Sequence, residues 1–142
     1  MATFNKFNSF VEAMAEKVHN LGSDTLRVAL TNTAPSATDT GFLPGSLHPP
    51  PAAANGYTAG GNTPAITSSA QTSGTYKLVL ADTVFSAAGG SIGPFRYAIL
   101  YNDTAASDEL IGYHDYGTSI TLLVGETFTW DADATTGVIQ IV

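Results

Sequence analysis

The strongest constraint on the fold is a series of short apolar segments that runs from about residue 24 to the end of the chain, with glycine, proline or asparagine between them. In 24–31, Leu26, Val28 and Leu30 alternate with more polar residues, as in a strand with one buried face. Turn signals recur roughly every 8 to 12 residues, which is typical of antiparallel sandwiches and barrels. The strand–helix alternation of a parallel sheet is missing. We therefore expect a mainly β fold, an antiparallel β-sandwich or jelly-roll-like barrel.

The main β body is expected over 56–142. Its most apolar segment, 95–101, is predicted to lie at the centre of a sheet, and the glycine-rich stretch 87–94 is predicted to be a turn region. The glycines of 56–61 indicate tight turns or a close backbone approach, and the lysine and hydroxyl residues of a phosphate-binding loop are missing there. The remaining predicted strands cover 64–72, 76–80, 83–85, 110–116, 120–124, 127–131 and 138–141.

The first 21 residues carry apolar side chains three and four positions apart, the pattern of an amphipathic helix. Thr3 or Asn5 is a candidate for its N-cap, and Gly22 is a natural left-handed stop. We therefore predict a helix over 4–20. Its phenylalanines either cover an open face of the sheet, which we favour, or pack against a partner subunit. These phenylalanines are Phe4, Phe7 and Phe10.

Regular structure is not expected over 33–55, because Pro35, Pro44 and the run 49–51 remove backbone donors and fix the chain. An irregular segment of this length is unusual inside a small domain. It is either mobile or an extended arm that lies on another surface. Its candidate anchors are Phe42, Leu43 and Leu47.

The composition fits one domain that spans 1–142 and is held together by its core alone. The chain has 142 residues and no cysteine, so disulfides and thiolate metal sites are excluded. Charged residues make up 12% of the chain, about half of the usual share, and small hydroxyl and glycine residues replace them. Such a surface either packs against neighbouring protein subunits, which we favour, or belongs to a solvated β domain that tolerates small residues.

The net charge of −7 comes from the second half of the chain. Residues 1–77 carry four basic and four acidic side chains, whereas residues 78–142 carry one basic and eight acidic ones. Nucleic-acid binding requires many lysines and arginines, so it is not expected. We find neither a secretion signal nor an apolar run of about 20 residues, and we expect a protein made in the cytoplasm without a membrane segment.

The three histidines do not show the spacing of metal ligands. His19 is expected at the end of the predicted helix, where a cation would interact favourably with the last carbonyls. His48 lies in the proline-rich segment. His114 and Asp115 are neighbours on a predicted strand, so their side chains are expected on opposite faces.

A calcium site is suggested only in part by Asp131, Asp133, Thr135 and Gly137. The glycine stands one position late and the closing glutamate is missing, so we favour a turn that caps the last hairpin. The pair Asp108–Glu109 is a weaker candidate for holding a cation together with other loop carboxylates.

Catalysis has little support in the sequence. The eight acids of the second half leave a carboxylate pair for glycoside hydrolysis open, but the single tryptophan, Trp130, alternates with Phe128 as core residues do. No Gly-x-Ser-x-Gly nucleophile motif is present. We expect no enzyme, and we assign no catalytic residue, cofactor-binding residue or metal ligand.

Two further features of the apolar strands require an interpretation. Arg96 lies within the most apolar stretch, and we predict a structural ion pair with one of the acids near it. The tyrosines near strand centres or ends fit either β propensity or an interface, because tyrosine buries area and keeps a polar tip. They are Tyr97, Tyr101, Tyr113 and Tyr116.

Several sequence strings resemble small virion proteins of tailed bacteriophages, and together they cover most of the chain outside the proline-rich segment. The run 49–51 departs from that pattern. The strings are FNKFNSFV (4–11), VHNLG (18–22), LRVALTNTAP (26–35), GYTAGG (56–61), SIGPFRYAILYND (91–103) and LIGY (110–113).

The resemblance implies a head decoration, or cement, protein: a structural protein that binds the major capsid protein as a homotrimer on the outer surface of the capsid. Weak contacts would then multiply over many copies. In this interpretation the acidic half faces solvent, and the helix or the 33–55 arm contacts the partner. The alternatives are a tail or fibre protein that binds a host receptor or glycan, which exposed tyrosines in a groove would favour, and a small carboxylate hydrolase.

Overall fold

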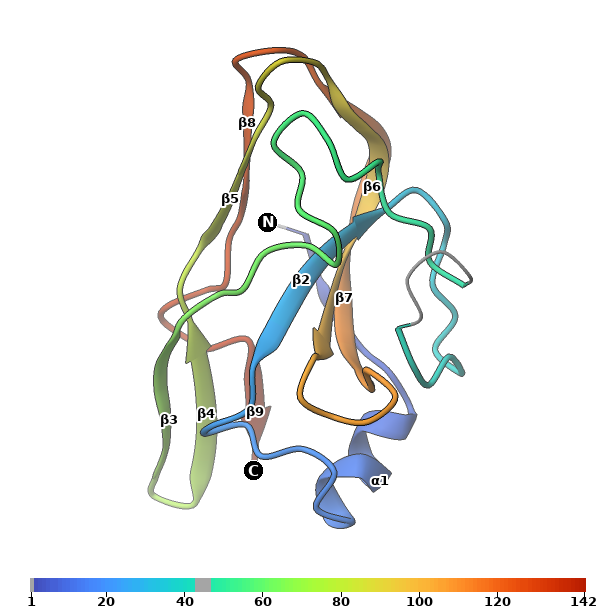
Figure 1. The fold of residues 1–142 in the computed structure, drawn as a ribbon. Helices are drawn as coiled ribbons and strands as arrows, with labels where there is room; N and C mark the ends of the chain where they lie inside the picture. Colours follow the sequence, from blue (N-terminus) through green and yellow to red (C-terminus); the bar gives the residue numbers. More distant parts are fainter. Residues whose placement is uncertain (1, 43–46) are drawn as a thin grey trace.

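The computed structural model describes residues 2–42 and 47–142, and its largest element is a four-stranded antiparallel sheet. The strand order is β1-β7-β6-β2, so the first strand pairs with a strand more than 100 residues away along the chain: Phe4 is opposite His114. Figure 1 shows β2, β6 and β7 crossing the middle of the molecule. The strands are β1 (Phe4–Lys6), β2 (Leu26–Thr31), β6 (Ile92–Asn102) and β7 (Leu110–Leu122).

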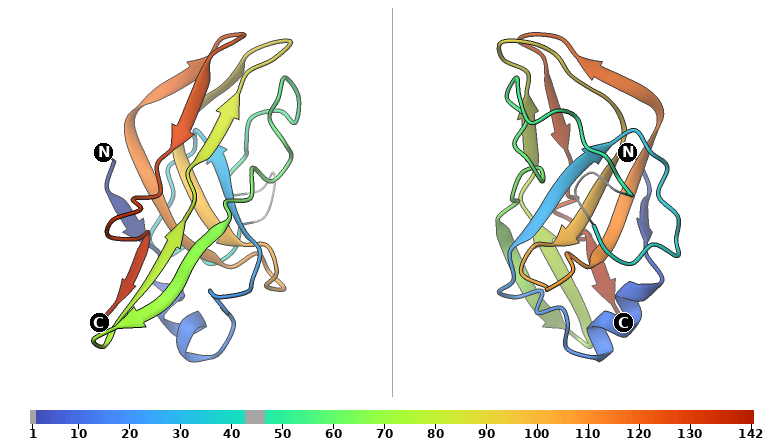
Figure 2. Two further views of the ribbon diagram at one scale, coloured as in Figure 1. Left: turned by 90° about the vertical axis from the view of Figure 1, so that its left-hand side faces the viewer. Right: turned by 45° about the vertical axis from the view of Figure 1, so that its right-hand side comes forward.

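A second layer packs against one face of this sheet. Three strands pair in the order β3-β4-β9, and β5 pairs with β8. The pair β5–β8 continues the second layer beyond β4 (Figures 1 and 2). The strands of this layer are β3 (Ile66–Thr72), β4 (Thr75–Leu80), β5 (Thr83–Ser86), β8 (Thr127–Trp130) and β9 (Ile139–Ile141).

The main core lies between the two layers. Leu30 of β2, Leu100 of β6 and Ile111 of β7 meet Leu78 of β4 and Trp130 of β8, and each of these side chains is at most 1% exposed. Burial of one such side chain stabilises the fold by about 1.5–3 kcal/mol. The expectation of a mainly β, antiparallel, sandwich-like fold is confirmed. The finer expectation of a jelly-roll-like barrel stays a prediction.

Part of the other face of the four-stranded sheet is buried as well, and the proline-rich segment covers that part. Phe42 is fully buried there and stacks on Tyr101 at 4.3 Å between ring centroids. The segment also bonds to the sheet through Leu110 N, which donates to Thr40 O at 3.0 Å. The described part of 33–55 is therefore an arm laid on its own sheet.

Burial on both faces explains why β6 is a nearly continuous apolar run and lies inside the sheet, as predicted. Of the three expected anchors of the arm, Phe42 is confirmed, whereas Leu47 is 48% exposed and the expectation for it is wrong. Leu43 lies outside the described residues. His48, at 1% exposed, is the anchor that the sequence did not indicate.

The predicted helix over 4–20 is wrong in extent. Helix α1 covers only Ser9–Ala15, and Asn8, not Thr3 or Asn5, is its N-cap residue. The three-residue spacing of the phenylalanines arises differently: Phe4 packs against the main core from an extended strand, whereas Phe7 lies in the cluster under the arm. The helix ends before Lys17, which adopts the left-handed conformation with φ 65°, so Gly22 is not the stop.

Two strand boundaries also differ from the prediction. The second half of the expected turn 87–94 belongs to β6, because Ile92 is buried and pairs with Leu122. The expected strands 110–116 and 120–124 are one strand, β7, whose pairing with β6 is irregular between them. The remaining predicted strands agree with the structure to within two residues at each end.

The glycine-rich segment 56–61 covers the outer edge of β2. Tyr57 Oη accepts a hydrogen bond from Leu30 N at 3.0 Å, and burial raises the pKa of this tyrosine to about 12. Val28 and Asn62 exchange backbone bonds in an antiparallel bridge. Gly61 has φ +85°, and a Cβ atom on it would lie 1.9 Å from Val28 O. The close backbone approach predicted for this segment is therefore confirmed.

Candidate binding surface

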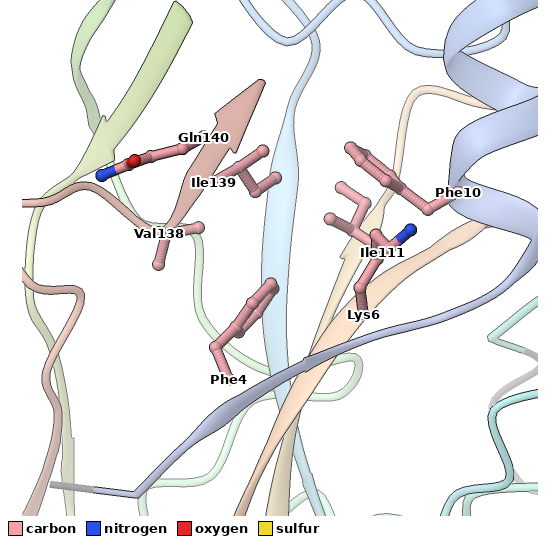
Figure 3. Close-up of a pocket in the computed structure, with 7 residues that line it drawn as sticks. All are labelled: Phe4, Lys6, Phe10, Ile111, Val138, Ile139 and Gln140. Atoms are coloured by element: carbon pink, nitrogen blue, oxygen red, sulfur yellow. The ribbon is translucent and has the colours of Figure 1, made fainter. Parts of the chain in front are cut away.

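An apolar groove separates the N-terminal strand and helix from the last strand (Figure 3). It consists of a smaller pocket of about 140 Å³ and a wider one of about 570 Å³. Both are lined by Lys6, Phe10 and Gln140, so they form one continuous surface, which we call the terminal groove. Its further lining residues are Phe4, Ile111, Val138 and Ile139 in the smaller pocket, and Val11, Met14, Ala15, Ile141 and Val142 in the wider one.

The groove exists because two sheets end there. β1 is the last strand on one side of the four-stranded sheet, and β9 is the last strand of the three-stranded sheet. Within residues 2–42 and 47–142, no strand pairs with the outer edge of either. Antiparallel strands exchange hydrogen bonds at alternate residues, so each edge keeps backbone N–H and C=O groups that point away from its sheet.

The floor of the groove is part of the main core, whereas its rim is exposed and apolar. Ile111 is fully buried, and Figure 3 shows the Phe4 side chain pointing from β1 toward Val138. On the rim, Val11 is 55% exposed and Val142 is 99% exposed. Exposed apolar side chains that adjoin one another are typical of interaction sites.

Charge distinguishes the groove from the rest of the chain. Among the described residues that line the groove, Lys6 is the only one with a charged side chain, in a chain whose net charge is −7. The sequence pattern did not indicate this surface, because the apolar spacing predicted a helix that would contain Phe4 and Lys6. Which strands form sheet edges depends on long-range pairing, which no local pattern reveals.

The three histidines lie apart, and all are buried. His19 is not at a helix end: its ring stacks on Phe10, and its Nδ1 accepts a hydrogen bond from Asn102 Nδ2 at 3.0 Å. The orientation of the Asn102 side-chain amide is set by its Oδ1, which accepts hydrogen bonds from the backbone N–H groups of Thr104 and Ala105. Burial lowers the pKa of His19, partly offset by the nearby charges of Glu109 and Asp24.

His48 fixes the arm. Its ring faces Phe42 at 6.3 Å between centroids, and its Nε2 lies 3.3 Å from Asp39 Oδ2. Burial lowers the pKa of this imidazole, and the Asp39 carboxylate raises it to a smaller extent. Both groups lie in the segment that covers the sheet, so they serve its attachment.

His114 lies in the main core, where its Nδ1 accepts a hydrogen bond from Trp130 Nε1 at 3.0 Å. This bond places the imidazole proton on Nε2. Burial lowers the pKa of His114 to about 4, against a smaller opposing effect of Asp131. Asp115 points to the opposite face, as predicted, and Trp130 is a fully buried core residue, as predicted.

The ion pair predicted for Arg96 is confirmed, and its partner is Asp115. Arg96 Nε and Nη2 donate to the two carboxylate oxygens at 2.8 and 2.9 Å. The pair lies at the surface, and the guanidinium lowers the pKa of the Asp115 carboxyl. The arginine also lies 5.2 Å from the centre of the Tyr97 ring.

The acidic residues that were considered as cation ligands lie in turns. Asp133 Oδ1 accepts backbone bonds from Thr135 and Thr136, so a turn is present as predicted. It does not cap a hairpin, because β8 pairs with β5 and β9 pairs with β4. Asp108 has a raised pKa, first because of burial and then because of the charges of Asp103 and Glu109. In the part of the chain that the structure describes, no three His, Asp or Glu side chains are placed to hold a metal ion.

The four tyrosines singled out in the sequence contribute mainly to packing inside the protein and little to its exposed surface. Tyr97 and Tyr101 are buried, and Tyr101 Oη donates to Gly60 O at 2.8 Å. Tyr113 and Tyr116 are half-buried and contact other aromatic rings. The pattern therefore does not form the exposed tyrosine groove that a glycan-binding surface would present.

Comparison with known proteins found no matching family model, no matching curated protein and no matching solved structure. Among the described residues, no helix is both long and apolar enough to cross a membrane.

Proposed function

We propose that this chain is a non-enzymatic virion protein, a capsid decoration (cement) protein that binds the major capsid protein of a phage head shell. The terminal groove carries the proposal: it is an open apolar surface between two sheet edges on an otherwise well-packed β body. The virion context comes from the sequence resemblance to small proteins of tailed phages. A homotrimer would present three copies of the groove to the shell, so modest contacts would add up to firm attachment.

We assign the contact with the shell to the terminal groove and not to the 33–55 arm. Phe42 of that arm is fully buried against its own sheet, and Thr31 Oγ1 donates to Pro49 O at 3.0 Å. Deletion of the arm would therefore expose the sheet, and a loss of binding would not distinguish contact from unfolding. A substitution on the groove's exposed rim is the cleaner test.

Val11→Asp should weaken binding to purified shells that lack this protein by at least about tenfold, because a charged carboxylate would lose its water at the apolar contact. Val11 is 55% exposed in the free protein, so the fold should tolerate the change. Val84→Asp is the matched control, since Val84 is 51% exposed on β5, outside the groove lining. Co-sedimentation with shells measures both, and equal binding of the two variants would contradict the assignment.

Cryo-electron microscopy of the particle that carries this protein tests the location. Density at regular sites on the head shell, with the terminal groove toward the capsid protein, is the expected result. Density confined to the tail would contradict decoration and favour the alternative, a tail protein that binds a host receptor or glycan.

A further inference from the structure

We propose that the terminal groove accepts an extended strand from the capsid protein, which pairs with the free edges of β1 and β9 and joins the two sheets. This inference rests on the proposed function and specifies how the partner binds. Three observations on the described residues carry it: the strand edges of β1 and β9 without a partner, the apolar floor between them, and the positive charge of Lys6.

The backbone of the groove is suited to a strand. β1 and β9 each have a partner on one side only among the described residues. In the left view of Figure 2 both strands run downward, β1 from the N-terminus and β9 toward the C-terminus, so a single inserted strand would be antiparallel to both. An added strand of this kind satisfies backbone groups on each edge, which gives affinity without a preformed pocket for a small ligand.

The side chains that line the groove determine which sequence the inserted segment can have. Because strand side chains alternate, one face of the inserted segment would lie over Ile111 and Val138 on the floor. That face should carry apolar residues of moderate size. Lys6 lies where the smaller and the wider pocket meet, so the segment should carry an acidic or neutral residue there and no lysine or arginine.

Two other sheet edges, those of β2 and β3, fit such a partner less well. The outer edge of β2 is bridged by Asn62. The outer edge of β3 belongs to a strand of mostly polar, exposed residues, Ile66–Thr72, which offers no apolar floor. The terminal groove therefore combines free backbone groups with apolar area, which these two edges do not.

Hydrogen exchange measured on the full chain, free and bound to purified capsid shells, tests the insertion. We expect at least tenfold slower exchange for backbone amides in both Phe4–Lys6 and Ile139–Ile141 on binding. Side-chain docking on the rim would slow exchange in neither edge strand. Shell binding without this protection would overturn strand insertion and leave the proposed function standing, whereas no binding would overturn both.

A blocking substitution provides an independent readout. Lys6 is exposed, so Lys6→Trp should fold normally while its indole fills the groove, and binding to shells should fall at least tenfold. Val84→Trp, on β5, is the control and should bind as the unaltered protein does. Unchanged binding of Lys6→Trp would overturn the inference. Protection of both edges in the protein alone, rising with its concentration, would overturn it as well, because a second copy would then be the occupant.

Discussion

Replacing Gly61 with alanine should lower the free energy of unfolding by about 3 kcal/mol or more. At φ +85° an alanine is strained by about 1 kcal/mol or more, because its Cβ crowds the backbone. In addition, the new Cβ would lie 1.9 Å from Val28 O, so the segment must move away from β2. The two backbone bonds between Val28 and Asn62 would then weaken, each worth about 1 kcal/mol.

Gly74→Ala is the matched control for this prediction. Gly74 has nearly the same backbone angle, φ +84°, but no atom lies within 4 Å of an added Cβ. Its substitution should therefore cost only the backbone strain, about 1 kcal/mol. Urea unfolding of both variants measures the difference. Equal losses would show that the contact of Gly61 with β2 does not matter for stability.

The protein should lose about 3 kcal/mol of stability through His114 alone as the pH falls from about 6.5 to about 4. In the folded chain the pKa of His114 is about 4, against 6.5 when the side chain is free in solution. Above pH 6.5 the imidazole is neutral in both states and has no effect. Below pH 6.5, His114 binds a proton in the unfolded chain but not in the folded chain. Unfolding therefore becomes more favourable by about 1.4 kcal/mol per pH unit.

The hydrogen bond that Trp130 Nε1 donates to His114 Nδ1 contributes to this loss of stability. A proton on Nδ1 of His114 would face the indole N–H, so two donors would oppose each other in the core. The charged groups near the imidazole do not prevent this loss: Asp131 raises the pKa of His114, but burial lowers it more. The pKa values of His19 and His48 are also lowered, so these residues should add losses of the same sign.

His114→Asn isolates the contribution of this one residue. The amide oxygen of asparagine can accept the bond from Trp130 and does not titrate, although the smaller side chain lowers stability at every pH. The free energy of unfolding of this variant should therefore fall less steeply between pH 6.5 and 4.5 than that of the unaltered protein. Parallel curves for the two proteins would show that His114 does not cause the acid sensitivity.

The parts of the fold that follow from local pattern could be predicted. The alternation in β2 and the long apolar run of β6 both identified strands. The single buried face expected for β2 is wrong, because the arm also buries Ala29 and Thr31 on its other face. The helix predicted for the first 20 residues is wrong because a three-residue apolar spacing also arises when a strand, an irregular residue and a short helix each direct one phenylalanine toward the interior. Phe4, Phe7 and Phe10 do so from three different backbone conformations.

The candidate site could not be predicted, because it depends on pairing between distant segments. Lys6 and Gln140 are 134 positions apart in the sequence numbering and line the same groove. The ion pair of Arg96 shows the same limit: the sequence indicated a carboxylate partner, but only the register of β6 with β7 selects Asp115. Local signals identify which residues form strands, and the choice of neighbours is made by the packed core.

The pairing order of the main sheet has a consequence for the synthesis of the protein. β2 pairs with β6, and β1 pairs with β7, so neither early strand has its partner until most of the chain has been made. At a synthesis rate of about 5–20 residues per second, the apolar side chains of β2 stay without their partner strand for several seconds. During synthesis the first third of the chain therefore leaves the ribosome before it can fold, and high expression rates should favour aggregation of this protein over its accumulation in soluble form.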